Sequence, residues 1–162
     1  MKIKRNMETE QNKTSSYLSF TLAGELFAIH VDYVIKIMEM TTFTKIPQGP
    51  PYLLGVTNLT GSVLPVIDSY LKFGFDPPQK EQSVIIVLNV SFNGKSTEIG
   101  ITADVANEVF EVSKEEIKPY PALGSKYNAE YIKGVINREN RFVLILNVEK
   151  LFSEDEINDL IQ

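Results

Sequence analysis

The chain has 162 residues, a hydrophobic fraction of 43% and a formal net charge of −5, which suit one globular domain or two small subdomains. Because it has no cysteine, disulfides and thiolate metal sites are excluded. The acidic balance argues against a nucleic acid partner, and no apolar run is long enough for membrane insertion. Residues 1–16 are polar and lack the apolar core of a secretory signal, so we expect a disordered tail on a cytoplasmic protein.

The first apolar segments predict a β-hairpin followed by a rigid loop. Residues 17–22 and 26–31 have the alternating, β-branched and aromatic composition of strands. Residues 32–38 fit either a strand or a single helical turn. The three prolines of residues 47–51 remove backbone donors and restrict their neighbours, so this segment is neither helix nor inner strand.

A second hairpin is predicted from residues 52–58 and 63–67, two apolar runs separated by a short turn. Pro65 lies inside the second run and lacks a backbone N–H, which points to a sheet edge or a bulge. Asp68 follows directly and is expected to cap a short amphipathic helix over residues 69–75.

A polar, proline-bearing linker at residues 76–82 separates this half of the chain from the next. After it, residues 83–92, 96–103 and 107–112 have the composition of strands. Asn93-Gly94, between the first two, is the strongest hairpin-turn signal in the chain. The second half therefore begins as the first did, with a β-hairpin.

Two capping boxes predict helix starts. Ser113 and Ser153 are each followed three residues later by glutamate, the pattern in which the two side chains satisfy each other's backbone donors. The second box opens a C-terminal helix within residues 153–162. Many short strands with frequent turns, and few short helices, predict an all-β protein of barrel or sandwich type.

The hairpin unit occurs twice, because residues 52–73 align with residues 131–152 without a gap. Identical residues fall at Tyr52/Tyr131, Gly55/Gly134, Val56/Val135, Asn58/Asn137 and Phe73/Phe152, and Asn147 matches Asp68 as a second helix cap. Such a repeat indicates a duplicated architecture. We place the first repeat at about residues 17–75 and the second at about 83–152, and we expect each repeat to close into a small barrel, which removes exposed strand edges.

The segment Gly55–Asp68, GVTNLTGSVLPVID, resembles the GVxNLRGxxxPVxD signature of the CheW-like family, the coupling proteins and kinase regulatory domains of bacterial chemotaxis. Ile46-Pro47, Gly100-Ile101 and Tyr131-Ile132 also match in the expected order, so the resemblance covers residues 17–152 as one CheW-like domain. It implies two five-stranded, SH3-like β-barrels packed on each other, in agreement with the internal repeat.

The resemblance also implies a function, that of a non-catalytic adaptor. Members of the family link the cytoplasmic tip of a chemoreceptor to the regulatory domain of a chemotaxis histidine kinase, in receptor arrays at the membrane. One barrel meets the kinase, and a hydrophobic groove near the barrel junction takes the receptor helix. No kinase core or receiver domain accompanies the domain, so we expect a free-standing coupling protein. The alternatives are an adaptor of a non-flagellar system such as pilus motility and, from the fold alone, a small β-barrel ligand-binding protein.

The resemblance assigns candidate receptor- or kinase-binding positions. They are Val34, Lys36, Asn58, Leu59, Thr60, Gly61, Val84, Gly100 and Ala106. Two of them depart from the family pattern, since Thr60 stands where an arginine is typical and Lys36 where its glutamate partner is typical. Both halves of an ion pair are therefore replaced. Either the partner-facing surface is specialised, or both positions are solvated surface where substitution costs little.

The sequence offers no catalytic constellation, so we expect no enzymatic activity, no metal site and no cofactor. His30 is the only histidine, which excludes histidine metal clusters and favours a structural or surface role. Asp68 and Asp104 are isolated carboxylates without a second acid at a matching spacing. The glycines near residue 58 are not followed by the Gly-Lys-Ser/Thr of a phosphate-binding loop.

Overall fold

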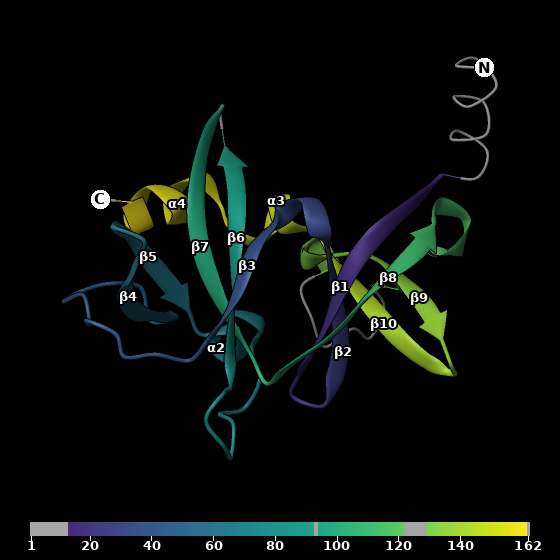
Figure 1. The fold of residues 1–162 in the computed structure, drawn as a ribbon, viewed down its shortest axis with the longest axis horizontal. Helices are drawn as coiled ribbons and strands as arrows, with labels where there is room; N and C mark the ends of the chain where they lie inside the picture. Colours follow the sequence, from purple (N-terminus) through teal and green to yellow (C-terminus); the bar gives the residue numbers. More distant parts are fainter. Residues whose placement is uncertain (1–12, 93, 122–128, 162) are drawn as a thin grey trace.

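The computed structural model of the chain describes residues 13–92, 94–121 and 129–161. These residues form two five-stranded β-sheets that lie side by side, with short helices beside them (Figure 1). The arrangement confirms the predicted all-β class with two five-stranded, SH3-like subdomains, short helices and a helix near the C-terminus.

The strand order is β8-β1-β2-β10-β9 in sheet A and β3-β6-β7-β5-β4 in sheet B. The strands of sheet A are β1 (Thr14–Leu22), β2 (Glu25–His30), β8 (Val105–Ser113), β9 (Ile132–Arg138) and β10 (Arg141–Leu146). The strands of sheet B are β3 (Val34–Glu39), β4 (Leu53–Leu59), β5 (Ser62–Ile67), β6 (Val84–Phe92) and β7 (Lys95–Ala103). The helices are α2 (Ser69–Phe73), α3 (Val148–Leu151) and α4 (Glu154–Ile161), and the 3-10 turns are η1 (Val31–Tyr33), η2 (Lys114–Glu116) and η3 (Ala129–Tyr131).

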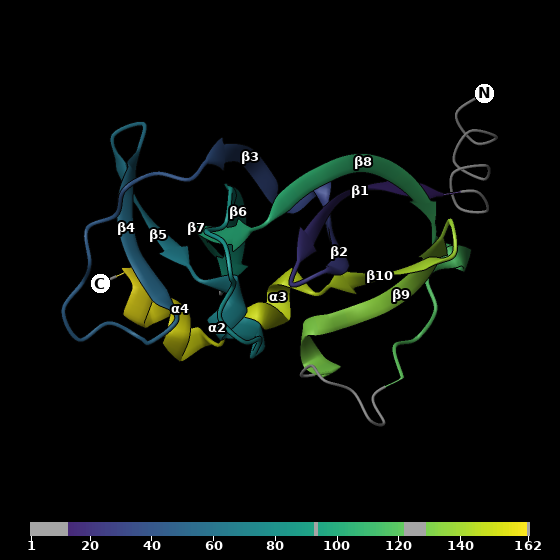
Figure 2. The ribbon, with the colours of Figure 1, turned by 90° about the horizontal axis from the view of Figure 1, so that it is seen from below.

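The two repeats exchange their first hairpins, so the expectation that each repeat closes on itself is wrong. The β1–β2 hairpin of the first repeat lies in sheet A with β8, β9 and β10, and the β6–β7 hairpin of the second lies in sheet B with β3, β4 and β5. The join is parallel in both sheets, β2 to β10 and β7 to β5. Figure 2 shows β8 continuing from β7 across to sheet A. An apolar hairpin fits either partner by its residue pattern, so the pattern alone did not distinguish the two pairings.

Three apolar clusters fill the molecule, and the largest lies between the sheets. Sheet A has an inner cluster around Phe110 and Ile145, and sheet B has one around Leu64 and Ile85. The junction cluster combines residues of both sheets and the helices, among them Phe20, Phe27, Ile29, Ile67, Phe73, Ile86, Leu88, Ile99, Leu144, Leu151 and Ile157. Successive strand residues point to opposite faces. One face of each exchanged hairpin therefore packs into the inner cluster of its sheet, and the other packs into the junction cluster.

The glycines that match between the repeats are required by close backbone approach. A Cβ built on Gly55 would lie 2.6 Å from the carbonyl oxygen of Thr44, and one on Gly134 would lie 2.9 Å from that of Lys118. In both repeats the loop before the strand crosses over it there and forms a β-bridge with the following residue. A side chain at either glycine would push the loop off its strand.

Several local predictions are confirmed with adjustments. Strand β1 begins at Thr14, so residues 14–16 belong to the sheet and not to a tail. The ambiguous segment 32–38 contains both alternatives, a 3-10 turn and then strand β3. The Asp68 carboxylate caps α2 by accepting from the backbone N–H of Tyr70 at 3.0 Å. Asn147 occupies the N-cap position of α3 as predicted, but its side chain makes no capping hydrogen bond.

Pro65 does not lie on a sheet edge, because β5 is flanked by β4 and β7. The parallel ladder between β5 and β7 pairs only Val66 and Ile67 and begins just after the proline. In the second repeat, Leu144 stands at the matching position and is paired with β2. The proline therefore shortens the ladder by one residue instead of excluding the strand from the sheet interior.

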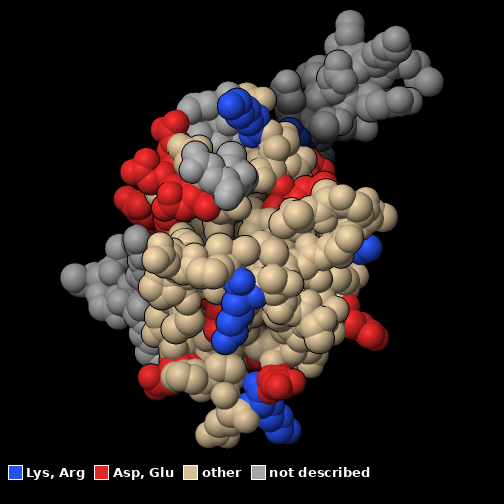
Figure 3. Space-filling view, turned by 90° about the vertical axis from the view of Figure 1, so that its left-hand side faces the viewer, with Lys and Arg blue, Asp and Glu red and all other residues tan. Residues whose placement is uncertain are grey.

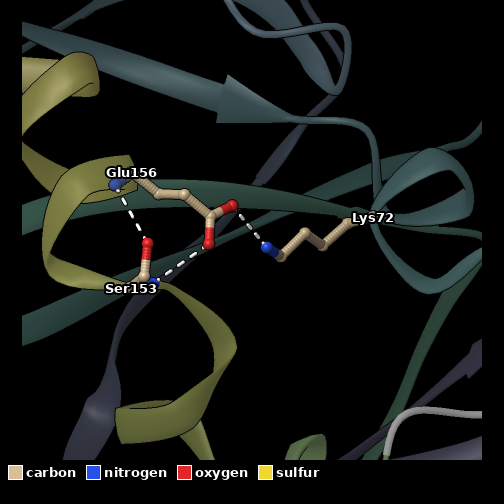
Figure 4. A network of polar contacts seen from close by, with 3 residues as sticks. All are labelled: Lys72, Ser153 and Glu156. Carbon is tan, nitrogen blue, oxygen red and sulfur yellow. Dashed lines mark hydrogen bonds and ion pairs between the residues drawn. The ribbon is translucent and has the colours of Figure 1, made fainter.

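Lys72 of α2 is buried beside the sheets and is paired with Glu156 of α4 (Figure 4). Its side chain is 7% exposed, and its Nζ lies 2.6 Å from the Glu156 carboxylate. Three aromatic rings also surround this ammonium. Those of Tyr52 and Tyr131, the matched tyrosines of the two repeats, have centroids 4.9 and 5.3 Å away, and that of Phe152 lies 5.0 Å away. Cation–π attraction and the ion pair together dock α4 onto α2.

The Glu156 carboxylate also completes the predicted capping box of α4. It accepts from the Ser153 backbone N–H at 3.0 Å, and the Ser153 hydroxyl accepts from the Glu156 backbone N–H at 3.1 Å. Burial alone raises the pKa of Glu156, but hydrogen bonds from Lys72, the Ser153 backbone and Tyr52 favour the ionised form more strongly. They lower the pKa of Glu156 from 4.5 to about 2.

The substitution Glu156→Gln is expected to lower the free energy of unfolding by on the order of 3 kcal/mol at pH 7, because it leaves the Lys72 ammonium buried without its counter-ion. A carboxylate with a lowered pKa contributes stability above its unfolded pKa and loses it as the pH falls through the folded pKa. The difference between wild type and variant should therefore shrink between about pH 5 and pH 2. Urea denaturation across this range measures it.

Asp155→Asn is the matched control, because it removes an exposed charge from the same helical turn. The control should change stability by about 0.5 kcal/mol or less. A loss for Glu156→Gln no larger than that of Asp155→Asn would contradict a stabilising pair at this position.

Candidate functional site

The predicted site residues Asn58, Leu59, Thr60 and Gly61 form the tip of the β4–β5 hairpin. Thr60 and Gly61 both have positive φ, 44° and 86°, as a two-residue turn of type I′ requires. The Asn58 side-chain oxygen accepts from the backbone N–H of Gly61 at 2.9 Å, which closes the turn. Thr60 is β-branched, and such residues are strained in the left-handed region.

Leu59 holds this tip to the protein, and its neighbours face outward. Leu59 is buried in the inner cluster of sheet B, whereas Asn58, Thr60 and Gly61 are exposed. Val63, just after the turn, is 72% exposed. The tip thus exposes the polar residues Asn58 and Thr60 and the apolar Val63 on a well-defined hairpin turn.

Strand β3, at one edge of sheet B, carries two more predicted residues. Val34 is half-buried against the junction cluster, and Lys36 is exposed. A register shift between these two residues interrupts the pairing of β3 with β6. Ile35 and Ile37 are also exposed there, at 45% and 42%, so the edge strand exposes an apolar side chain on either side of Lys36.

Lys36 lies in β3 and Thr60 in the turn that follows β4, and β3 and β4 are the two ends of the pairing order of sheet B. Within the described residues, neither side chain has a hydrogen bond or an ion pair. The replacement of both halves of the family's typical ion pair therefore leaves two exposed, unpaired side chains.

The remaining predicted residues do not join the hairpin tip in one patch. Val84, at the start of β6, is half-buried against the junction cluster. Gly100 is buried in sheet B, and a Cβ on it would lie 2.7 Å from a methyl carbon of Ile85, so the packing there leaves no room for a side chain. Ala106 is half-buried in β8, opposite Phe20 of sheet A.

A broad uncharged surface surrounds the β4–β5 tip. Residues 40–67 contain a single charged residue, Lys45. This stretch forms the proline loop, β4 and β5, and the loop exposes Ile46 to 45%. Figure 3 views the molecule from the sheet B side and shows a wide area of uncharged residues with few charges, while acidic residues gather near one end. We call residues 40–63 with Ile35 and Ile37 the uncharged face.

The second hairpin tip, between β9 and β10, has a different surface that the sequence reasoning did not single out. The Arg138 guanidinium lies 4.2 Å from the ring centroid of Phe110 and 3.5 Å from the Glu108 carboxylate. Phe142, which occupies the position of Val63 in the other repeat, is 68% exposed. The alignment of the repeats would have identified Phe142, because both residues are the second of the strand that follows the turn.

The carboxylates and the histidine have structural partners. Asp104 accepts from the Ala23 backbone N–H at 3.0 Å and from the Tyr70 hydroxyl at 2.7 Å, and so links the first hairpin to α2. The His30 Nδ1 accepts from the Asp32 backbone N–H at 3.1 Å. Among the described residues, no group of three or more histidine or acidic side chains is placed to hold a metal ion. No helix in the described part of the chain is long and apolar enough to cross a membrane.

The family model of the CheW-like domain matches residues 16–156. The chain belongs to the CheW-like family. It is 31% identical over 140 residues to the probable chemotaxis protein CheW of Rhizobium etli, a match that covers 86% of this chain and 88% of the relative. It is 32% identical to the chemotaxis protein CheW of Klebsiella aerogenes, covering 87% and 83% of the two chains.

A solved structure agrees with this membership. The scaffolding protein TtCheW of Thermoanaerobacter tengcongensis superposes with a TM-score of 0.77 at 26% identity, over 88% of this chain and 90% of that one. The match includes both sheets, since it spans most of the chain. The family resemblance seen in the sequence is therefore confirmed.

Replacing Thr60 by asparagine should raise the free energy of unfolding by about 1 kcal/mol, because asparagine tolerates positive φ better than a β-branched residue. Urea denaturation measures the change. Thr57→Asn, in the body of β4, is the matched control and should destabilise, because asparagine is disfavoured in strands. If Thr60→Asn is neutral or destabilising, the strain assigned to the tip is absent.

Proposed function

We propose that the protein is a non-catalytic adaptor that couples chemoreceptors to a chemotaxis histidine kinase in signal transduction. Membership of the CheW-like family over residues 16–156 carries this proposal. Its relatives in Rhizobium etli and Klebsiella aerogenes are named as chemotaxis proteins, and the similar solved structure is that of a scaffolding protein. The chain works in the cytoplasm, at receptor arrays on the membrane, and binding alone is its contribution.

The uncharged face is the surface we assign to the regulatory domain of the kinase. Interface cores are depleted of charged residues, and residues 40–63 of this face contain one charge, Lys45, while Lys36 lies between Ile35 and Ile37 at its border. Val63 and Ile46 expose apolar side chains on it. The rigid tip at Asn58–Gly61 supplies preorganised polar groups, which reduces the cost of ordering on association.

The cytoplasmic tip of the receptor is assigned to the junction between the sheets. Val34 and Val84 are both half-buried against the junction cluster, so their exposed parts extend that apolar core to the surface. An amphipathic receptor helix presents apolar side chains at helical spacing and binds such a surface. Ala106, half-buried in β8, is the candidate from the other sheet.

The substitution Val63→Glu should weaken binding of the kinase regulatory domain about tenfold or more, because it places a charge at the centre of the uncharged face. Calorimetric titration with the regulatory domain from the same cell measures the affinity, which we expect to be micromolar for the wild type. Leu71→Glu is the matched control. Leu71, like Val63, is an exposed branched aliphatic residue, at 53%, but it lies on α2 and outside the uncharged face. Equal affinities for the two variants would place the kinase elsewhere.

The double substitution Lys36→Glu with Thr60→Arg restores the family's typical pair and tests whether this surface is specialised. If the surface is specialised, the affinity for the kinase regulatory domain should change about tenfold. Each single variant serves as the control, because an effect of the pair requires both charges. An unchanged affinity would mean that both positions are solvated surface.

A further inference from the structure

A cavity of 490 Å³ opens at one end of sheet A, away from the hairpin tips. Its walls come from separate parts of the chain, namely the start of β1, the end of β2, the end of β8 with η2, and β9. The volume lies in the range of sites for small organic ligands. No residue assigned to the kinase or the receptor lines it, so the inference is independent of the proposed function.

Basic side chains converge on this cavity in a protein of negative net charge. Lys13, Lys114 and Lys133 line it, and none of the three has an ion-pair partner in the part of the chain that the structure describes. His30 also lines it. Because its Nδ1 accepts from the Asp32 backbone N–H, the neutral ring carries its proton on Nε2 and can donate from there. The nearest acid to this ring is Asp32, whose carboxylate is 3.6 Å from Nδ1.

Apart from Ser15, the remaining lining residues belong to the inner cluster of sheet A or pack against it. Tyr17 and Val112 are buried, at 3% and 2% exposure, and Ile117 is half-buried against the same cluster. The Tyr17 ring meets the His30 ring edge-on at a centroid distance of 5.2 Å. The cavity therefore combines an apolar floor with cationic groups at its rim.

The matching end of sheet B has larger apolar residues at two of the corresponding positions. Lys133 corresponds to Leu54 at the constant offset between the repeats, and Ile117 corresponds to Phe43, since each precedes the residue that bridges to its strand. In sheet B, Leu54 and Phe43 pack against the inner cluster together with Met40. In sheet A, a smaller apolar residue and a lysine stand in place of the phenylalanine and the leucine. The lining of the cavity therefore differs from the matching end of sheet B at these two positions.

We propose that this cavity binds an organic anion with a carboxylate group and a ring-sized apolar body. The three lysines attract and pair with the carboxylate, and the floor of Tyr17, Val112 and Ile117 removes the apolar body from water. The carboxylate belongs either to a free small molecule or to an acidic residue next to an aromatic one in a partner protein.

The test is a titration of the full chain, followed by NMR of the backbone amides, with two probes. Phenylacetate represents the free anion, and the peptide acetyl-Glu-Phe-amide represents the protein-borne one. We expect saturable shifts of the Lys114, Lys133 and His30 amides at about millimolar concentration. A response to phenylacetate supports a free ligand, and a response to the peptide alone supports a partner segment. No saturable shift at these amides with either probe would overturn the proposal.

Two variants make the test specific. Lys133→Leu introduces the residue that the first repeat has at this position, so it should fold normally and weaken binding about tenfold or more. Lys118→Leu is the matched control, because it makes the same change at an exposed lysine of the same sheet region outside the cavity lining, and its affinity should equal that of the wild type. Lys133→Gln keeps the side-chain length and isolates the charge. If Lys133→Leu and Lys133→Gln both bind as the wild type does, the cavity is not the site.

Discussion

The apolar junction between the two sheets is the constraint on which the rest of the structure depends. Phe27 of the first repeat stacks on Phe20 and Phe73 within it, at centroid distances of 5.8 and 5.9 Å. Because hairpins are exchanged, each sheet contains strands from both repeats, so neither repeat can complete a sheet without the other. The hydrophobic effect thus stabilises both sheets through one shared interface. The outward-facing hairpin tips, on which the proposed binding surface rests, are held in fixed relative positions by it.

Electrostatic interactions complete this scaffold at one place. The Lys72 ammonium is buried beside aromatic rings that come from matching positions in both repeats, and α4 supplies its counter-ion. A buried ion pair adds little net stability by itself but strongly penalises the absence of either partner. The C-terminal helix is therefore required by the duplicated domain that precedes it. On the surface seen in Figure 3, charged residues are sparse on the uncharged face, and acidic residues gather near α4.

The sequence predicted those features that depend on neighbouring residues. Strand alternation located most of the hairpins, the Asp68 side chain caps α2 as expected, and the glycines that matched between repeats proved to be sites of close backbone approach. Features that depend on distant residues were missed. Glu156 lies 84 positions from Lys72, and no local pattern links the two. The hairpin exchange was missed for the same reason, because nothing in the residues of an apolar hairpin indicates which repeat it will pair with. Leu59 and Gly100, which the resemblance assigns as candidate binding positions, are buried, and the resemblance carries no information on exposure.

The exchanged hairpins also bear on how such a chain could have originated. A single repeat folded alone would leave β3, β4 and β5 without the hairpin that fills the middle of their sheet. Two separate copies of one repeat would supply that hairpin to each other and form a symmetric homodimer by domain swapping. Joining the copies through residues 76–82 makes their association intramolecular. Folding then no longer depends on protein concentration, because the linker sets a fixed effective concentration of one copy near the other. Once fused, the two halves were free to diverge, so that Phe43 and Leu54 pack against the inner cluster at one end of sheet B while the matching end of sheet A is basic and has a cavity.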